Sequence, residues 1–454
     1  MYTFKQEIDK CYDTDVVIVG GGVAGCAAAV SAARHGRKTM LVEQSGILGG
    51  QATLGLVTPL SSIRSRSGKA FGGLIDEICA EVRRLSGEYC VPDSSETGDR
   101  IAAPHILKYV LLKLCREAGV TVLFHTQLIG ADTDEGRVER IIVAEKSRLA
   151  VIEAKAFIDA SGDGDLIALA GDDYSLGSEP GVLESLTETG LDKVHYTGGR
   201  EYSGYAPSER VMQPVSIFFT MGGVDYEKAA SFNNKNLKYG DLGLSFGEFS
   251  KLPYAGDCGF EQVEGDEKLP LPQGRILVSR GVRADVAVVN MSRVVGIDGS
   301  DADSLNEGEL KAQKQVIELV DFLKRCVPGF EKAYYLESAA TLGVRETRRL
   351  VGKYVLTGTD VINCRTFENA AARGSYIIDI HDPKGKAKAI GGEIHGDFYE
   401  IPEGSLESRK FANLLAAGRC ISADHVAHSS TRIQGTCIMT GESAGRLAAE
   451  LCGE

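Results

Sequence analysis

Side chains that could transfer protons or hold anions are concentrated at residues 424–432, Asp-His-Val-Ala-His-Ser-Ser-Thr-Arg. This segment carries His425, His428 and Arg432 in a chain that has only 8 histidines. A histidine can act as a general acid or base near neutral pH, and an arginine can hold a carboxylate or an oxyanion with two hydrogen bonds. The segment is therefore a candidate catalytic or substrate-binding site. The alternative is a pair of hydrogen-bonded structural histidines.

A second candidate lies in residues 344–349, Val-Arg-Glu-Thr-Arg-Arg. Arg345, which we take as a further candidate catalytic residue, would share one face with Arg348 if the segment is helical. Glu346 leaves an alternative open, in which an ion-pair network holds two domains together. Arg293 has the same two interpretations.

Three glycines near the N-terminus have the spacing of a dinucleotide-binding turn. In the G-x-G-x-x-G formed by Gly20, Gly22 and Gly25, the first glycine permits a tight turn and the second leaves room for a pyrophosphate. The third lets a helix pack closely on the sheet, and the N-terminus of that helix attracts phosphates. Glu43, about 20 residues further on, is placed to accept hydrogen bonds from ribose hydroxyls. A merely structural tight turn is the alternative.

The elements that would position these glycines form a complete β-turn-α-β unit. Residues 15–20 are a β-branched run typical of a strand buried on both faces, and residues 26–34 are alanine-rich and strongly helical. Residues 39–43 are the second strand. Gly49-Gly50-Gln51 then offers backbone that could run beside a cofactor, although a flexible surface loop is the alternative.

The local pattern of the sequence changes at about residue 172, where a turn-rich stretch begins. We therefore predict an α/β protein with a Rossmann-like three-layer dinucleotide-binding domain, split in sequence into residues 1–171 and 395–454. Residues 172–394 would be an inserted, mostly β substrate or cap domain. The predicted helices are 72–86, 104–118, 305–326 and 435–451. The predicted strands are 120–126, 138–145, 149–159, 215–221, 351–357, 375–380 and 414–418, with a polar turn at 387–396.

Several blocks spread over most of the chain resemble the bacterial FAD-dependent oxidoreductase family, which shares the glutathione reductase-like FAD-binding fold. The family is itself related to flavoproteins of the heterodisulfide reductase and fumarate reductase type. The blocks are Gly20–Gly25 with Glu43, Gly49–Gly55, Phe157–Asp165, Asn290–Arg293, Leu342–Arg348, and Leu414–Ser422 through Gly445.

The resemblance implies non-covalent FAD. Asp159-Ala-Ser-Gly162 is similar to the family's D-A-T-G signature on the adenosine side, with serine in place of threonine. The strand ending at Gly418 and the helix that follows are similar to the family's contact with the ribityl chain and flavin ring, although Arg419 replaces the aspartate of many relatives. The implied cofactor-binding residues are Gly20, Gly22, Val23, Ala24, Gly25, Glu43, Gln44, Gly49, Gly50, Gln51, Leu128, Ala160, Gly162, Gly418, Arg419, Thr436 and Cys437.

Composition argues against several other classes. The net charge of −13 and pI near 5.3 disfavour nucleic-acid binding. The sequence contains no apolar run of about 18 residues and no secretory h-region, so we expect a cytoplasmic protein that does not bind membranes. The 11 cysteines contain no C-x-x-C pair, which gives no support to a metal site and favours free thiols.

The predicted function is hydride transfer between a small organic substrate and flavin N5, with the proton handled by a nearby histidine or arginine. Two alternatives stay open: an electron-transfer flavoprotein subunit of a larger redox complex, and a non-catalytic nucleotide-binding sensor. There is no second G-x-G-x-x-G after a strand, so a dedicated NAD(P)H domain is not evident. NAD(P)H or another electron partner could still bind transiently, and a homo-oligomer is compatible with the chain's size.

Overall fold

A parallel sheet forms the centre of the fold. The computed structural model describes residues 7–86, 103–178, 211–233, 244–246, 276–281, 283–381 and 389–453. Five strands run parallel in the order β3-β2-β1-β6-β18. Strand β1 lies at the centre because the β-branched residues at 16–19 are all buried. The strands are β1 (Lys10–Val19), β2 (Thr39–Val42), β3 (Thr121–Leu123), β6 (Arg148–Asp159) and β18 (Leu414–Ala416).

The sheet divides at the long strand β6, whose two parts have different neighbours. Its C-terminal part pairs with β1 and β18, whereas its N-terminal part pairs with β1 and with antiparallel strand β5. Strands β4 (Gln127–Asp134) and β5 (Arg137–Glu145) complete a meander. The strand predicted at 120–126 is shorter and forms β3, because His125 takes a positive φ of 51° and breaks the extended backbone. Strand β4, which follows this break, was not predicted.

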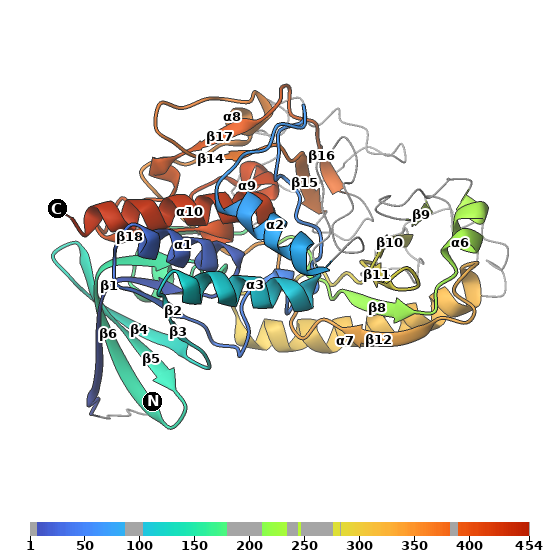
Figure 1. The fold of residues 1–454 in the computed structure, drawn as a ribbon, viewed down its shortest axis with the longest axis horizontal. Helices are drawn as coiled ribbons and strands as arrows, with labels where there is room; N and C mark the ends of the chain where they lie inside the picture. The colour runs from blue at the N-terminus through green and yellow to red at the C-terminus, as the bar shows by residue number, and fades with distance from the viewer. Residues whose placement is uncertain are drawn as a thin grey trace.

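Four helices pack on or beside the parallel strands, and the last of them comes from the C-terminus (Figure 1). Helix α10 lies along α1 and also contacts β6 and β18. The approach is close because glycines face α1: a Cβ added at Gly441 would lie 2.1 Å from the carbonyl oxygen of Ala24, and one at Gly445 would lie 2.2 Å from that of Ala28. The helices are α1 (Val23–Arg34), α2 (Leu74–Ser86), α3 (Pro104–Glu117) and α10 (Gln434–Leu451).

A second hydrophobic core lies beyond the parallel sheet, at the right of Figure 1. It combines a five-stranded sheet of order β12-β8-β11-β10-β9 with the 25-residue helix α7. The mixed α/β fold with an inserted, mostly β region is therefore confirmed. The elements are β8 (Phe219–Gly222), α6 (Tyr226–Asn233), β9 (Leu244–Phe246), β10 (Ile276–Arg280), β11 (Ala287–Val289), α7 (Ala302–Cys326) and β12 (Tyr334–Ser338).

The two cores divide the chain differently from the expected domain boundary at residue 394. Apart from Leu56 and Val57, the second core takes its residues from 215–344. Buried side chains from Leu350 to Ile401 pack with the first core. Three small two-stranded sheets and two short helices of the described residues accompany the first core, and they come from 174–176 and from 348–431: β7 (Tyr174–Leu176) with β13 (Arg348–Leu350), β14 (Ala370–Gly374) with β17 (Tyr399–Pro402), β15 (Ile378–His381) with β16 (Ala389–Gly392), α8 (Gly358–Ile362), and α9 (His425–Thr431).

Three local predictions in this region were wrong. The strand expected at 351–357 does not form, because Gly352 donates its backbone N–H to the Ser422 hydroxyl instead of to a neighbouring strand. The strand expected at 375–380 begins only at Ile378, after the Ser375 backbone N–H has bonded to the Ser62 hydroxyl. The polar turn expected at 387–396 contains strand β16, because Ala389–Gly392 pairs with β15.

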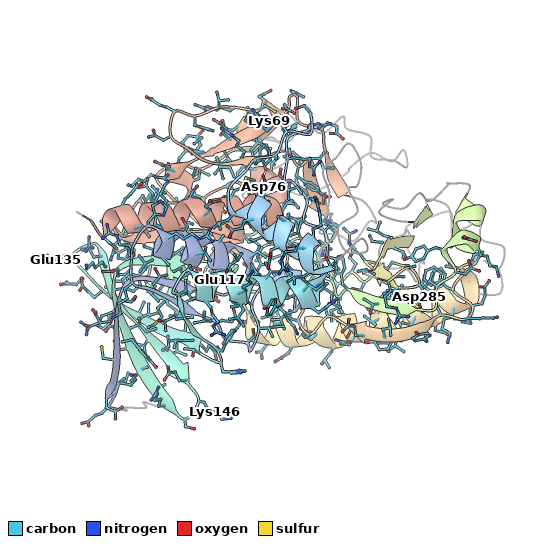
Figure 2. All side chains as sticks on the ribbon, viewed as in Figure 1. Lys69, Asp76, Glu117, Glu135, Lys146 and Asp285 are labelled. Atoms are coloured by element: carbon cyan, nitrogen blue, oxygen red, sulfur yellow. The ribbon has the colours of Figure 1, made fainter. Side chains whose placement is uncertain are left out.

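Charged side chains occupy the periphery. Figure 2 shows Asp76 on α2 and Glu117 on α3, with Glu135 and Lys146 at the tips of the β4–β5 and β5–β6 turns. No helix in the described part of the chain combines the length and apolar character that crossing a membrane requires.

Eight described cysteines are free thiols, but Cys326 is disulfide-bonded, so the expectation of free thiols fails at that residue.

Candidate functional site

A cavity of about 660 Å³ opens at the C-terminal ends of the parallel strands. Its walls begin where strands end: Gly20 follows β1, Glu43 follows β2, Ala160 follows β6 and Ala417 follows β18. In open α/β sheets, ligands bind in the crevice outside these strand ends. The cavity volume also falls within the roughly 300–1,000 Å³ typical of small-molecule and cofactor sites.

The three glycines of the first turn each meet a different steric demand. Gly20 has a φ of +99°, and a Cβ there would lie 2.4 Å from the carbonyl oxygen of Ala160. A Cβ on Gly25 would lie 1.8 Å from the carbonyl oxygen of Gly20, so this residue sets the packing of helix on strand. A Cβ on Gly22 would meet nothing within 4 Å, because Gly22 borders the open cavity. These are the three roles expected for a pyrophosphate-binding turn.

Glu43 lies at one end of the cavity and is held by the backbone. Its carboxylate accepts hydrogen bonds from the backbone N–H groups of Gly21 at 2.7 Å and Ser45 at 2.7 Å. A carboxylate oxygen has more than one lone pair, so these bonds orient the side chain without exhausting its capacity as an acceptor. Gln44 and Leu128 line the same end of the cavity.

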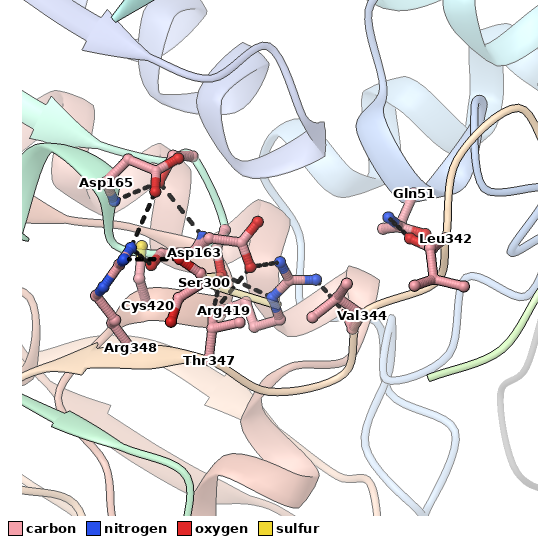
Figure 3. Close-up of polar contacts among 12 residues, drawn as sticks. Gln51, Asp163, Asp165, Ser300, Leu342, Val344, Thr347, Arg348, Arg419 and Cys420 are labelled. Atoms are coloured by element: carbon pink, nitrogen blue, oxygen red, sulfur yellow. Dashed lines mark hydrogen bonds and ion pairs between the residues drawn. The ribbon is translucent and has the colours of Figure 1, made fainter. Parts of the chain in front are cut away.

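The second glycine pair packs directly against the first turn. Gly49 donates its backbone N–H to the carbonyl oxygen of Gly21 at 2.8 Å, and a Cβ on Gly50 would approach Gly22 Cα to 3.1 Å. The next residue, Gln51, donates from Nε2 to the carbonyl oxygen of Leu342 at 3.0 Å (Figure 3). Its Oε1 is buried and accepts no hydrogen bond from the described residues.

Asp159 organises the turn after β6. It is fully buried and accepts hydrogen bonds from the Ser161 N–H and hydroxyl, and from the backbone N–H of Ile167. Burial raises the pKa of its carboxyl group, although these donors oppose the shift. The turn thereby places Ala160 and Gly162 in the cavity wall.

Arg419 ties three segments of the cavity wall together. Its guanidinium donates to the carbonyl oxygen of Gly162 at 2.7 Å and to Asp163 Oδ1 at 2.5 Å, and also to the carbonyl oxygen of Val344 (Figure 3). This engagement explains how an arginine can replace the aspartate of many relatives. The side chain braces the wall, and does not supply the carboxylate contact that aspartate would make.

A second arginine closes the same side. Arg348 donates to Asp165 Oδ1 at 3.0 Å and to the carbonyl oxygen of Ser300 at 3.3 Å (Figure 3). Asp165 lines the cavity, and its side chain is half-exposed there. The surrounding protein, followed by the carboxylates of Asp159 and Asp163, raises the pKa of Asp165 to about 6.

The predicted cofactor-binding residues come together at this cavity with two exceptions. Gly25 acts in the packing behind the wall, and Thr436 is fully buried, where its hydroxyl bonds to Ser62. Fifteen of the predicted residues line the cavity: Gly20, Gly22, Val23, Ala24, Glu43, Gln44, Gly49, Gly50, Gln51, Leu128, Ala160, Gly162, Gly418, Arg419 and Cys437.

His425, one of the four candidate catalytic residues, does not line the cavity. It begins helix α9, and its Nδ1 lies 2.7 Å from Glu346 Oε1, which also contacts Arg349 Nη1 at 2.5 Å. All three side chains are buried. Burial opposes ionisation of Glu346, but His425 and Arg349 outweigh it and hold the pKa of the carboxyl group well below its usual range. The network therefore fits the structural alternative for His425 and Glu346.

His428 is also buried behind the wall. Its Nε2 lies 3.1 Å from the carbonyl oxygen of Arg419, and its Nδ1 has no hydrogen-bond partner among the described residues. Burial lowers the pKa of its imidazole well below the usual value. Neither predicted histidine therefore meets the open cavity in this structure.

Of the two candidate arginines, one lines the cavity and the other is next to a residue that does. Arg432 lines the wall, and Arg345 directly follows wall residue Val344 in an extended segment, not in the helix considered from the sequence. Arg432 Nη2 donates to the carbonyl oxygen of Asp379 at 3.1 Å. Asp379 also lies 3.4 Å from His381 Nε2. The sequence analysis missed Asp379 and His381, because no local spacing links them to residue 432. It also missed the wall residue Gln434, although Gln434 lies only two positions after Arg432.

The class of protein follows from this site and its fold. A glycine-rich turn, an acid after the second strand and a cavity at parallel strand ends define a dinucleotide-binding oxidoreductase fold. Residues 15–453 match the model of the FAD dependent oxidoreductase family, and the chain belongs to that family. It is therefore an FAD-binding enzyme.

Several solved structures are similar to this one over most of its chain. A geranylgeranyl bacteriochlorophyll reductase-like protein from Thermoplasma acidophilum is 14% identical, with a TM-score of 0.48, over 97% of this chain and 78% of that one. A flavin-dependent brominase is 12% identical, with a TM-score of 0.49, over 97% of this chain and 80% of that one. No curated protein matches the sequence.

The residues present fit FAD. Besides the space at Gly22, two acceptors, Gln51 Oε1 and Gln434 Oε1, are buried without partners among the described residues. Both side chains line the cavity. Hydroxyl and N–H donors of a bound dinucleotide would satisfy such acceptors, whose desolvation is otherwise unfavourable.

Replacing Glu43 with glutamine is expected to weaken FAD binding about tenfold, because one charged acceptor for ribose hydroxyls is lost and charge-assisted hydrogen bonds contribute about 1.5–3 kcal/mol. The dissociation constant would be measured by flavin fluorescence on the protein stripped of cofactor. Glu135→Gln, at the β4–β5 turn tip, is the matched control and should bind FAD normally. Equal affinities for both variants would contradict a role for Glu43 at the ribose.

Proposed function

We propose that the protein transfers a hydride between a small organic substrate and N5 of its bound flavin. The observation that carries the proposal is the set of residues that line the cavity. Glu43 and the phosphate-binding turn line it together with Arg432 and Gln434, which come from the segment at the end of α9 and the start of α10. Since the acid after the second strand binds ribose hydroxyls, the adenosine belongs at the Glu43 end and the flavin towards Arg432.

The chain's own residues then have three tasks. The turn from Gly20 to Gly25 and the N-terminus of α1 hold the pyrophosphate. Arg419 keeps the walls in position through its three contacts. Arg432 orients the substrate at the flavin end. Bound FAD supplies reversible two-electron chemistry, which no side chain of the protein can replace.

We assign the accompanying proton to the group formed by Arg432, Asp379 and His381, of which Arg432 lines the cavity, in place of His425 and His428. Burial, followed by the charge of Arg345, lowers the pKa of His381 to about 3, so the imidazole is neutral at pH 7 and is a weak base in the absence of substrate. A negative charge on a nearby substrate would raise that pKa towards neutrality. Full turnover after replacement of His381 with asparagine would exclude it.

The first experiment is to purify the protein, record its visible spectrum and identify the cofactor released by heat. Release of intact FAD would support non-covalent binding. Anaerobic bleaching of the flavin by candidate substrates, and by NADH or NADPH, would then identify the substrate and the electron partner, both of which stay proposals. A holoprotein whose flavin no donor reduces would contradict hydride transfer and favour a sensor.

A further inference from the structure

Two arginines at the flavin end of the cavity carry more hydrogen-bond donors than the described residues satisfy. Arg432 uses Nη2 on Asp379, while its Nε and Nη1 have no partner in the described chain. Arg345 donates from Nη1 to the carbonyl oxygen of Pro214 at 2.5 Å, and neither of its other nitrogens bonds to a described residue. An arginine has five N–H donors, so both guanidinium groups retain unused capacity.

A third donor points to the same cluster. Gln213 is 1% exposed, and its Oε1 accepts the backbone N–H of His381 at 3.0 Å. Its Nε2 is buried without a partner among the described residues. Gln213 precedes Pro214, whose carbonyl oxygen binds Arg345, so the 213–214 segment joins Arg345 to His381. Buried donors are normally satisfied, and here several are not.

The cluster also has more positive charges than carboxylates to balance them. The cluster consists of Arg345 and Arg432, and Asp379 is the carboxylate whose charge acts on both of them. Arg345 itself has no carboxylate within 4.0 Å in the described chain, and it is only 8% exposed. Burial, followed by the charges of Arg432 and Arg293, lowers the pKa of Arg345 to about 9. The arginine is still a cation at neutral pH, so the cluster has a net positive charge.

We infer that the substrate carries a carboxylate, which Arg432 binds at the flavin end of the cavity while Arg345 stabilises its charge from the adjoining position. A buried cation without an anionic partner is strongly unfavourable, and a bound carboxylate would supply both the charge and the acceptor oxygens that are lacking. A planar carboxylate matches the fork of a guanidinium group. The inference rests on the proposed function for its placement beside the flavin.

The test uses the FAD-loaded protein and isothermal calorimetry with acetate, succinate and benzoate, in a buffer free of other carboxylates. Acetamide, succinamide and benzamide are the neutral controls, and inorganic phosphate tests a tetrahedral anion. The variants are Arg345→Met and Arg432→Met. Arg325→Met, on the exposed face of α7, removes an arginine that pairs with Asp321 far from the cluster and serves as the matched control.

At least one carboxylate is expected to bind the wild-type protein and the Arg325→Met control equally, with no binding of its amide. Each cluster variant should weaken that binding at least about tenfold. Equal binding of the amide, tighter binding of phosphate, or unchanged affinity in both variants would overturn the inference, as would failure of all three carboxylates to bind.

The thermal unfolding midpoint distinguishes a ligand-binding arginine from a structural one, because the two roles predict changes of opposite sign. If Arg345 serves a ligand, Arg345→Met removes an unpaired buried charge, and its midpoint in the absence of carboxylate should equal or exceed that of the wild type. A large fall in the midpoint would indicate a structural arginine instead. Carboxylate binding without flavin reduction by any donor would support this inference and contradict hydride transfer, so the two failures are distinguishable.

Discussion

Gly22→Val is expected to fold normally but to lose FAD. Gly22 precedes helix α1 with φ −64° and ψ 177°, a conformation open to any residue, and an added Cβ meets no protein atom within 4 Å. The branched side chain would instead project into the space for the pyrophosphate. We expect FAD affinity to fall at least about 100-fold, equivalent to about 3 kcal/mol, whereas the weaker N-cap costs only about 1 kcal/mol. Flavin content and unfolding of the cofactor-free protein measure the two effects.

Gly25→Val in the same turn is the contrasting variant. Its Cβ would lie 1.8 Å from the carbonyl oxygen of Gly20, so helix α1 could not pack on β1. This variant should lose folded protein along with FAD, whereas Gly22→Val separates the two. Normal FAD content in Gly22→Val would contradict the placement of the pyrophosphate at this turn.

The second large effect is expected from Arg349→Met, which should lower the free energy of unfolding by about 3–5 kcal/mol, the usual cost of breaking a buried ion pair from one side. Arg349 and Glu346 are both completely buried. Besides its ion pair, Arg349 donates to the carbonyl oxygens of Ala423 and Gly177, each at 2.8 Å. Methionine would remove the donor to these two carbonyl oxygens and would leave Glu346 with His425 as its remaining ionisable partner among those described above.

Urea unfolding of the cofactor-free protein measures this effect without a contribution from ligand binding. Lys311→Met, on the exposed face of α7, removes a surface ion pair with Glu307 and should change stability by less than about 1 kcal/mol. A similar small change for Arg349→Met would show that the buried network contributes little.

The cofactor end of the site could be predicted from sequence because its signals are local. Gly20, Gly22 and Glu43 lie within one β-turn-α-β unit, where spacing along the chain fixes spacing in the structure. Side chains at the flavin end have no such relation. Asp379 meets Arg432 through strand β15, more than fifty positions earlier in the chain, and no periodicity predicts that contact.

The remaining differences between the predicted and the observed site arise because the structure buries residues that the sequence analysis expected at the cavity. His425 and His428 have the right chemistry, but helix α9 buries both against Glu346 and the backbone of Arg419. A short polar helix of seven residues gives no clear apolar periodicity, so its orientation could not be predicted. Tertiary contacts also override local propensity at residues 351–357, where a β-branched segment bonds to loops in place of a strand.

The contribution of β18 and α10 to the cavity sets an order of events during synthesis. Gly418, Arg419 and Cys437 are wall residues that come from the last forty positions of the sequence. While they are still inside the ribosome, β6 lacks the neighbour β18 and helix α1 lacks the cover of α10. The phosphate-binding turn at Gly20–Gly25 is translated long before these wall residues, so the nascent chain cannot enclose its cofactor until Gly418–Cys437 has also left the ribosome.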